Sequence, residues 1–193
     1  MHVRELIEKY YPEYYGWFDY PAEETVAFSN ADKEWGILGN FGHVTVTVDG
    51  VPFSTTERLF QVMKFSDPEA RKAVYQEPNP WAGKRIVARA FEKTCGPRPD
   101  WGMIIVDALK FCLMTKYDQC REFRSELART GSKFIVEKAA PHPNTYSAKL
   151  SKDGKTWSGP NLMGRLLMEL RDNGKLEYHL PEDAMRFSDL LEP

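Results

Sequence analysis

The sequence is poor in the residues that build disulfide frameworks and metal sites. Its 193 residues include only three cysteines, Cys95, Cys112 and Cys120, which are odd in number and form no CxxC pair. We therefore expect buried thiols in a reducing cytosol rather than a disulfide framework. The four histidines are scattered, with neither an HExxH motif nor clustered ligand spacing. We expect no structural or catalytic metal, and no cofactor.

Long apolar runs and a strong net charge are also lacking. No apolar segment approaches the roughly 20 residues that a membrane-spanning helix needs. The first residues carry charges of both signs, unlike the apolar centre of a signal peptide. We therefore expect a cytoplasmic protein with no membrane partner. The formal net charge of −2 argues against a generally basic nucleic-acid-binding surface, although a local phosphate site remains compatible with it.

The chain is long enough for one domain with a substantial core, and 13% of its residues are aromatic. We predict a single domain over residues 1–193, mainly α-helical with a small antiparallel β-sheet (α+β). Expected helices cover Val3–Tyr14 with a break near Pro12, Ser54–Phe65, Asp67–Tyr75, Trp81–Ala90, Asp100–Arg129 and Pro160–Arg171. Expected strands cover Thr25–Phe28, His43–Val48, Val51–Phe53 and Lys133–Glu137, with a turn at Asp49-Gly50, a loop over Pro141–Gly159, and a tail that folds back through Met185, Phe187 and Leu190.

One predicted helix, Ser54–Phe65, has an unusual distribution of polar residues. At about 100° per residue, Glu57, Gln61 and Lys64 form a single polar stripe, and apolar side chains occupy nearly all of the remaining surface. Such a helix is expected to be buried. A buried carboxylate, amide and ammonium are costly unless they meet partners or a polar ligand. The stripe therefore indicates a pocket for a polar, phosphorylated ligand.

A purely structural explanation exists for part of the stripe. Ser54 and Glu57 fit a capping box, in which a hydroxyl at the N-cap and a carboxylate three residues later satisfy the first backbone N–H groups. Lys64 alone could reach solvent with its long side chain. The capping box explains neither Gln61 nor Lys64, so we favour the binding pocket.

Three other segments carry candidate site residues. Gly36, Gly39 and Gly42 precede a strand, and such spacing suits either a close backbone approach to a ligand or a mobile turn. At Asp100-Trp101, N-capping and core packing compete with catalysis and stacking on a base. The segment Ser158–Arg165 opens the last helix, where free N–H groups could hold a phosphate, with capping by Ser158 or Asn161 as the alternative. Gly164 indicates close packing or a ligand.

Several of these segments, in this order, resemble the YbiA-like, or NADAR, family. The resemblance covers about residues 25–174, which leaves a helical extension at 1–24 and a tail at 175–193. It is carried by Phe28-Ser29, Gly36-Ile-Leu-Gly-Asn40-Phe41, Thr56–Phe65, Asp100-Trp101, Lys110, Lys116-Tyr117, Thr130-Gly131, Ile135-Val-Glu137 and Gly159–Leu170. The resemblance implies a mainly helical fold and N-glycosidase chemistry, which is hydrolysis of a C–N bond between ribose and a base or amine.

The resemblance also implies a set of site residues. The family's polar residues correspond to Glu57, Gln61 and Lys64. A carboxylate can stabilise an oxocarbenium-like centre and accept a proton from the attacking water, so Glu57 is the expected catalytic group, with Gln61 holding a ribose hydroxyl or the water. Lys64 is expected to anchor a phosphate. Further candidates for substrate binding are Phe28, Ser29, Asn40, Trp101, Tyr146, Ser147, Asn161 and Gly164, with Glu137 and Asp100 as reserve carboxylates.

The chain departs from the family pattern in two places. Gly39 stands where many members have Ser, and Tyr146-Ser147-Ala148 replaces a Trp-Gly ahead of the last helix. A few extra residues follow, around Ser151–Thr156. We therefore expect the segment from Tyr146 to Asn161 to set substrate choice.

Three functions fit the sequence. The first is an N-glycosidase acting on a phosphorylated ribosyl-base compound, including the ribosylamino-pyrimidine phosphates of riboflavin biosynthesis. The second acts on ADP-ribosylated guanine in nucleic acid, for which Arg85, Arg89, Lys93 and Arg98 could form a basic groove. The third is a non-catalytic sensor of NAD or ADP-ribose, which the presence of Glu57 argues against.

Overall fold

The computed structural model describes residues 2–139 and 144–191 of the chain. It contains two compact units, and each combines separate stretches of sequence. The first unit comprises Met1–Gly42 and Arg121–Leu176, and the second comprises His43–Cys120 and Glu177–Pro193. Helices account for 52% of the structure, and the sheets are small, which confirms the α+β class. That the whole chain folds as one domain stays a prediction.

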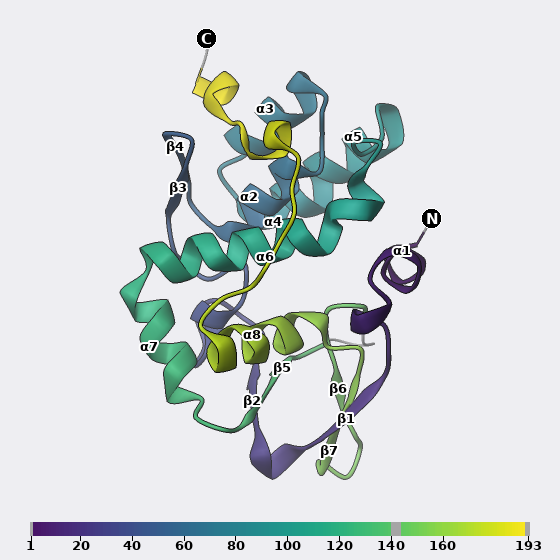
Figure 1. The fold of residues 1–193 in the computed structure, drawn as a ribbon, viewed down its shortest axis with the longest axis vertical. Helices are drawn as coiled ribbons and strands as arrows, with labels where there is room; N and C mark the ends of the chain where they lie inside the picture. The colour runs from purple at the N-terminus through teal and green to yellow at the C-terminus, as the bar shows by residue number, and fades with distance from the viewer. Residues whose placement is uncertain (1, 140–143, 192–193) are drawn as a thin grey trace. The chain divides into compact units, whose positions relative to one another are not determined.

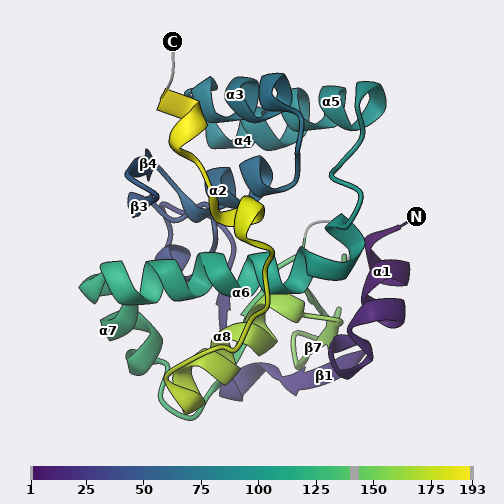
Figure 2. The same cartoon turned by 45° about the horizontal axis from the view of Figure 1, so that its top comes forward.

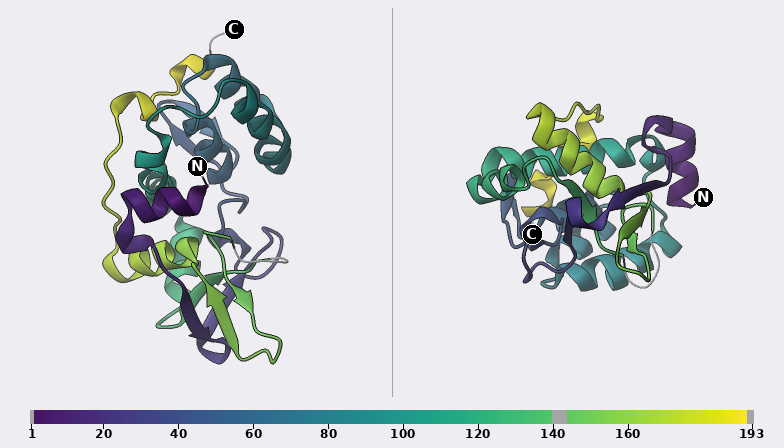
Figure 3. Two further views of the ribbon diagram at one scale, coloured as in Figure 1. Left: turned by 90° about the vertical axis from the view of Figure 1, so that its right-hand side faces the viewer. Right: turned by 90° about the horizontal axis from the view of Figure 1, so that it is seen from below.

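The first unit contains two small sheets with α-helices beside them (Figure 1). Its elements are α1 (Val3–Tyr10), β1 (Phe18–Pro21), β2 (Thr25–Phe28), α7 (Arg121–Arg129), β5 (Phe134–Glu137), β6 (Lys149–Leu150), β7 (Thr156–Gly159) and α8 (Leu162–Asn173). Strands β1, β7 and β6 form an antiparallel sheet, seen side by side in the left panel of Figure 3. Strands β2 and β5 instead pair in parallel, and the long chain segment between them permits this direction.

Strands β6 and β7 correct the expected loop over Pro141–Gly159, of which residues 140–143 lie outside the described part of the chain. Trp157 on β7 lies in a cluster with Tyr20, Val136 and Ala148, and only 7% of its surface is exposed. Strand β1, which contributes Tyr20, was not expected from the sequence either. These strands form because side chains that are distant in sequence pack together, since the local composition is that of a loop.

The second unit is built from a hairpin, several helices and the C-terminal tail. Its elements are β3 (Val46–Val48), β4 (Val51–Phe53), α2 (Thr56–Met63), α3 (Pro68–Gln76), α4 (Pro80–Ala82), α5 (Ala88–Thr94) and α6 (Trp101–Gln119). The hairpin turn at Asp49-Gly50 is confirmed, with φ values of 52° and 75°. The fold-back of the tail is confirmed as well, because Phe187 is fully buried and its ring lies 5.1 Å from that of Phe53. The end of the tail, Ser188–Leu191, contacts α3 and β4, and Figure 2 shows the tail in yellow.

The single long helix expected over Asp100–Arg129 is wrong. Helix α6 ends at Gln119, and Cys120 adopts an extended conformation (φ −116°, ψ 105°) before α7 begins at Arg121. No glycine or proline marks this break, so local sequence gave no signal for it. The expected end of α7 is correct, because Gly131 has the positive φ of 59° that closes a helix. Among the described residues, no helix has the length and apolar character needed to cross a membrane.

The buried ammonium of Lys116 on α6 should make the free energy of unfolding depend on pH. Its side chain is fully buried, and desolvation lowers the pKa of its ammonium from 10.5 to about 7. Between these two values the unfolded chain holds a proton that the folded protein lacks. The free energy of unfolding should therefore rise with pH from about 7 to 10 through this group, by up to about 1.4 kcal/mol per pH unit.

The measurement is urea unfolding of the native protein and of Lys116→Met at several pH values. We expect the difference between the two proteins to carry this slope, with the native protein gaining stability relative to the variant as the pH rises from about 7 to 10. A difference that does not change with pH would contradict the assignment.

Candidate active site on helix α2

Helix α2 carries two residues of the predicted polar stripe, Glu57 and Gln61, and the structure buries both as expected. Glu57 and Gln61 expose 3% and 5% of their surfaces. The N-cap of α2 is Thr55, whose hydroxyl accepts a hydrogen bond from the backbone N–H of Arg58 at 3.2 Å. Glu57 is therefore the second helical residue rather than the third, and the capping box between Ser54 and Glu57 is wrong. The carboxylate of Glu57 has other partners.

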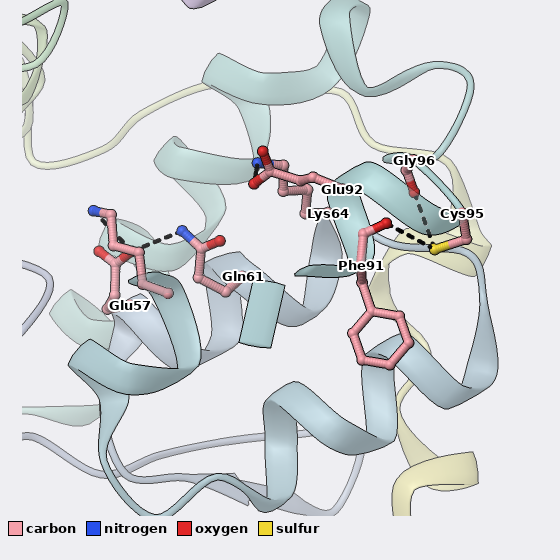
Figure 4. A network of polar contacts seen from close by, with 8 residues as sticks. Glu57, Gln61, Lys64, Phe91, Glu92, Cys95 and Gly96 are labelled. Carbon is pink, nitrogen blue, oxygen red and sulfur yellow. Dashed lines mark hydrogen bonds and ion pairs between the residues drawn. The ribbon is translucent and has the colours of Figure 1, made fainter. Parts of the chain in front are cut away.

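The carboxylate of Glu57 receives two donors on the same oxygen. The amide Nε2 of Gln61 donates to Oε1 at 2.8 Å, and the Nζ of Lys84 lies 3.0 Å from Oε1. Figure 4 shows Gln61 pointing toward Glu57 from the next turn of α2. The structure thus joins the two residues that the sequence proposed as catalytic.

Lys84 is a partner of the candidate carboxylate that the sequence did not predict. It lies far along the chain from Glu57, in the π-helical turn Gly83–Val87 that links α4 to α5. A buried carboxylate requires a nearby donor or cation, but no spacing rule connects α2 to this turn. The turn itself was predicted only as part of an ordinary helix. Short π-helical segments occur often at functional sites.

Lys64 lies apart from the Glu57 carboxylate, as the helical spacing predicts. It is the C-cap of α2, and its ammonium forms an ion pair with Glu92 of α5 (Figure 4). Its side chain is 18% exposed. A phosphate at this position would compete with Glu92, and the phosphate role of Lys64 stays a prediction.

The start of α6 is held by contacts within the second unit. Trp101 is 5% exposed, and its ring lies 5.2 Å from that of Phe60, so core packing accounts for it. Asp100 occupies the N-cap position without a capping hydrogen bond from its side chain. Its carboxylate instead accepts from Arg98, which also donates to Asp183 at 2.9 Å. Arg98 is buried and paired, which contradicts its expected place in a basic groove.

The remaining candidates belong to the first unit. Phe28 is 2% exposed, so the protein itself covers its ring in this structure, and its stacking role stays a prediction. Asn40 is buried, Ser29 is exposed and Tyr146 is partly exposed. Gly36 is explained by packing rather than by a mobile turn, because a Cβ there would lie 2.2 Å from the carbonyl oxygen of Asn30.

The side chain of Asn161, just before α8, forms hydrogen bonds with the backbone of β5. Its Oδ1 accepts from the backbone N–H of Glu137 at 3.1 Å, and its Nδ2 donates to the carbonyl of Ile135 at 2.9 Å. Its own backbone N–H donates to the carbonyl of Ser147 at 3.2 Å. Its side chain makes no cap to α8, so capping by Asn161 is wrong. Its contacts are those of a structural residue.

The expected phosphate seat at this helix start is also contradicted. The backbone N–H groups of Leu162 and Met163 donate to the carbonyls of Thr145 and Tyr146, each at 3.2 Å. These two donors are thus satisfied within the protein. The carbonyl oxygens of the segment before the helix lie where the oxygens of a bound phosphate would have to lie. The helix begins at Leu162, after Pro160 rather than with it.

Comparison with known proteins now adds to this geometry. Residues 25–173 match the model of the NADAR domain. The chain belongs to the NADAR family. The matched range agrees with the expected family-like core at about 25–174, and the resemblance drawn from the ordered motifs is confirmed.

Relatives of this NADAR chain carry enzyme names. It is 27% identical to N-glycosidase YbiA of Escherichia coli over 152 residues, which cover 79% of this chain and 89% of that protein. It is also 27% identical over 167 residues to a riboflavin biosynthesis protein of Vibrio vulnificus, where the match covers 86% of this chain but only 42% of the relative. The NMR structure of E. coli YbiA superposes with a TM-score of 0.64 at 27% identity, over 82% of this chain and 90% of that one.

Proposed function

We propose that this NADAR chain is an N-glycosidase that hydrolyses a ribosyl C–N bond, with Glu57 as the carboxylate base. The observation that supports this most is the buried carboxylate of Glu57, held by Gln61 and Lys84. Burying a carboxylate costs free energy, and this cost supports a use of Glu57 in binding or chemistry. The name of the E. coli relative, N-glycosidase YbiA, gives the reaction class.

In the proposed reaction, Glu57 accepts a proton from water as the water oxygen attacks the anomeric carbon of ribose. The C–N bond breaks, its electron pair stays on the nitrogen of the leaving base or amine, and that nitrogen takes up a proton from solvent, while Glu57 returns the proton that it accepted to solvent. Positive charge develops on the ribose ring in the transition state. Gln61 is placed one turn from Glu57, where its amide can also contact a ribose hydroxyl.

The first substrate class is a phosphorylated ribosyl-base compound, and no cofactor enters the proposed reaction. One relative is named a riboflavin biosynthesis protein, which supports offering ribosylamino-pyrimidine phosphates. The test incubates purified protein with these compounds and follows release of ribose phosphate. The proposal would be contradicted if neither ribose phosphate nor ADP-ribose were released from any phosphorylated ribosyl compound or from ADP-ribosylated guanine. That result would favour a non-catalytic sensor of NAD or ADP-ribose.

Lys64→Met tests the anchoring of phosphate within this proposal. Methionine keeps the alkyl packing and removes the charge. We expect KM for a phosphorylated substrate to rise about tenfold or more while kcat changes less, because the interaction is made in the ground state and the transition state alike. The control is the same comparison on a substrate without phosphate. An equal rise in KM on both substrates would contradict the phosphate role.

A second candidate substrate, ADP-ribosylated guanine in nucleic acid, is favoured by one surface. Arg85, Arg89 and Lys93 are spaced four residues apart and exposed along the helical segment that contains α5. Within the described residues none of the three has a hydrogen bond, ion pair or ring contact. Trp81, on the same segment, is 56% exposed. Unpaired cations beside an exposed aromatic ring suit a single strand, whose phosphates and bases they contact.

The double variant Arg85→Glu/Arg89→Glu tests this surface. We expect KM to rise about tenfold or more for ADP-ribosylated guanine in an oligonucleotide and to stay within about twofold for the free ADP-ribosylated nucleoside. Arg186→Glu is the control, since Arg186 is exposed in the same unit and pairs with Glu182. An equal rise in KM for the oligonucleotide and for the free nucleoside would contradict binding of nucleic acid by this surface.

A further inference from the structure

The two oxygens of the Glu57 carboxylate have different surroundings. Both Gln61 Nε2, at 2.8 Å, and Lys84 Nζ, at 3.0 Å, contact Oε1. Within the described part of the chain, no hydrogen-bond donor contacts Oε2. The group is 3% exposed, so its orientation is set by these two donors and by the surrounding packing. One oxygen is therefore fixed, and the other remains to accept a hydrogen bond from a ligand or water.

This asymmetry separates two roles that a carboxylate can have in glycosidic cleavage. A carboxylate that stabilises a cationic ribose ring acts through its negative charge. The ammonium of Lys84, 3.0 Å away, offsets that charge over the distance of a substrate. A carboxylate that acts as a base depends on a correctly placed oxygen. The two donors on Oε1 supply that placement, so the geometry suits a base, and the kinetic test below separates the two roles.

The position of Lys84 supports a role in placing Glu57. Lys84 lies in the π-helical turn Gly83–Val87, and α2 packs against this turn. Its side chain is 37% exposed, so the ammonium could have reached water, yet it lies on the buried carboxylate. Exposed lysines gain little from an ion pair alone. The contact between Lys84 and Glu57 therefore serves the buried carboxylate rather than the lysine.

We propose that Lys84 is a positioning residue that, with Gln61, holds Oε1 of Glu57 and leaves Oε2 to orient and deprotonate the attacking water. The inference rests on the proposed function, since it assumes that Glu57 is the base. It adds the residue that sets the geometry of this base and the oxygen that receives the proton.

The test measures kcat and KM for Lys84→Met and Lys84→Arg, each in the native background and together with Glu57→Gln, on whichever ribosyl compound the protein hydrolyses. We expect Lys84→Met to lower kcat about tenfold or more and to leave KM within about twofold. Lys84→Arg, which keeps a charged donor, should restore most of kcat. In the Glu57→Gln background, Lys84→Met should change kcat less than about twofold, because both substitutions disable the same group.

Other outcomes would overturn the inference. A native kcat in Lys84→Met, or a rise in KM alone, would make Lys84 dispensable or a substrate-binding residue. A higher kcat would mean that the ammonium of Lys84 weakens Glu57 rather than positions it. The same loss in both backgrounds would mean that Lys84 acts independently of Glu57. If Glu57→Gln itself kept full turnover, the proposed function would fail instead.

The controls separate function from stability. Arg186→Met removes a solvent-exposed ion pair with Glu182 in the same unit and should leave kcat unchanged. Thermal unfolding of each variant accompanies the kinetics. If Lys84→Met does not fold, Lys84→Gln supplies a neutral donor, and the inference then requires a kcat between those of the native protein and Glu57→Gln.

Discussion

Glu57→Gln is expected to lower turnover by about a hundredfold or more while the protein stays folded. The loss of a general base, or of charge stabilisation at a reacting centre, has this size in other enzymes. The amide keeps the shape of the carboxylate, and its oxygen can still accept from Gln61 and Lys84. Lys84 is 37% exposed, so its ammonium can turn to water when the negative charge is lost. The measurement combines kcat with thermal unfolding.

Glu57→Ala is the matched comparison. Alanine removes the acceptor altogether, so this variant should lose stability as well as turnover, because Gln61 is 5% exposed and loses its partner. The prediction would be contradicted by near-normal turnover in Glu57→Gln together with low stability in Glu57→Ala. That result would make the carboxylate a structural group of α2.

The core of the candidate site could be predicted because its signals are local. Glu57 and Gln61 are four residues apart on one helix, and their hydrogen bond follows from helical geometry. The burial of α2 follows from the apolar residues on its other faces. The hairpin at Asp49-Gly50 was likewise predictable, since the two residues favour the positive φ values that the turn adopts.

The rest depended on contacts between distant segments. Nothing near Glu57 in the sequence points to Lys84, because the π-helical turn that carries it has no sequence signature of its own. The break at Cys120 has neither glycine nor proline. Asn161 was read as a cap or a ligand, whereas its side chain bonds to β5, a strand far earlier in the chain. Polar residues that join segments in this way resemble ligand-binding residues until the fold is known.

Gly164 is a further residue whose role the sequence leaves open. A glycine inside a helix can allow either close packing of another segment or close approach of a ligand. In the structure a Cβ at Gly164 would lie 2.1 Å from the carbonyl oxygen of Ile135 and 2.6 Å from the side chain of Asn161. Helix α8 therefore packs on β5 with no room for a methyl group. Gly83, also helical and buried, offers the contrast, because the nearest atom to its Cβ would be 3.7 Å away.

We therefore expect Gly164→Ala to lower the free energy of unfolding by about 3 kcal/mol, since the obstructing atom belongs to the backbone and can move only with β5. Gly83→Ala should be neutral or stabilising by up to about 1 kcal/mol, because alanine favours helix and meets no clash. Urea unfolding of both variants measures the difference. If Gly164→Ala kept native stability and instead raised KM, the glycine would be making room for substrate. A loss of stability, together with an unchanged KM in the folded fraction, would assign Gly164 to the packing of α8 on β5 and leave the α2 carboxylate as the chemical centre.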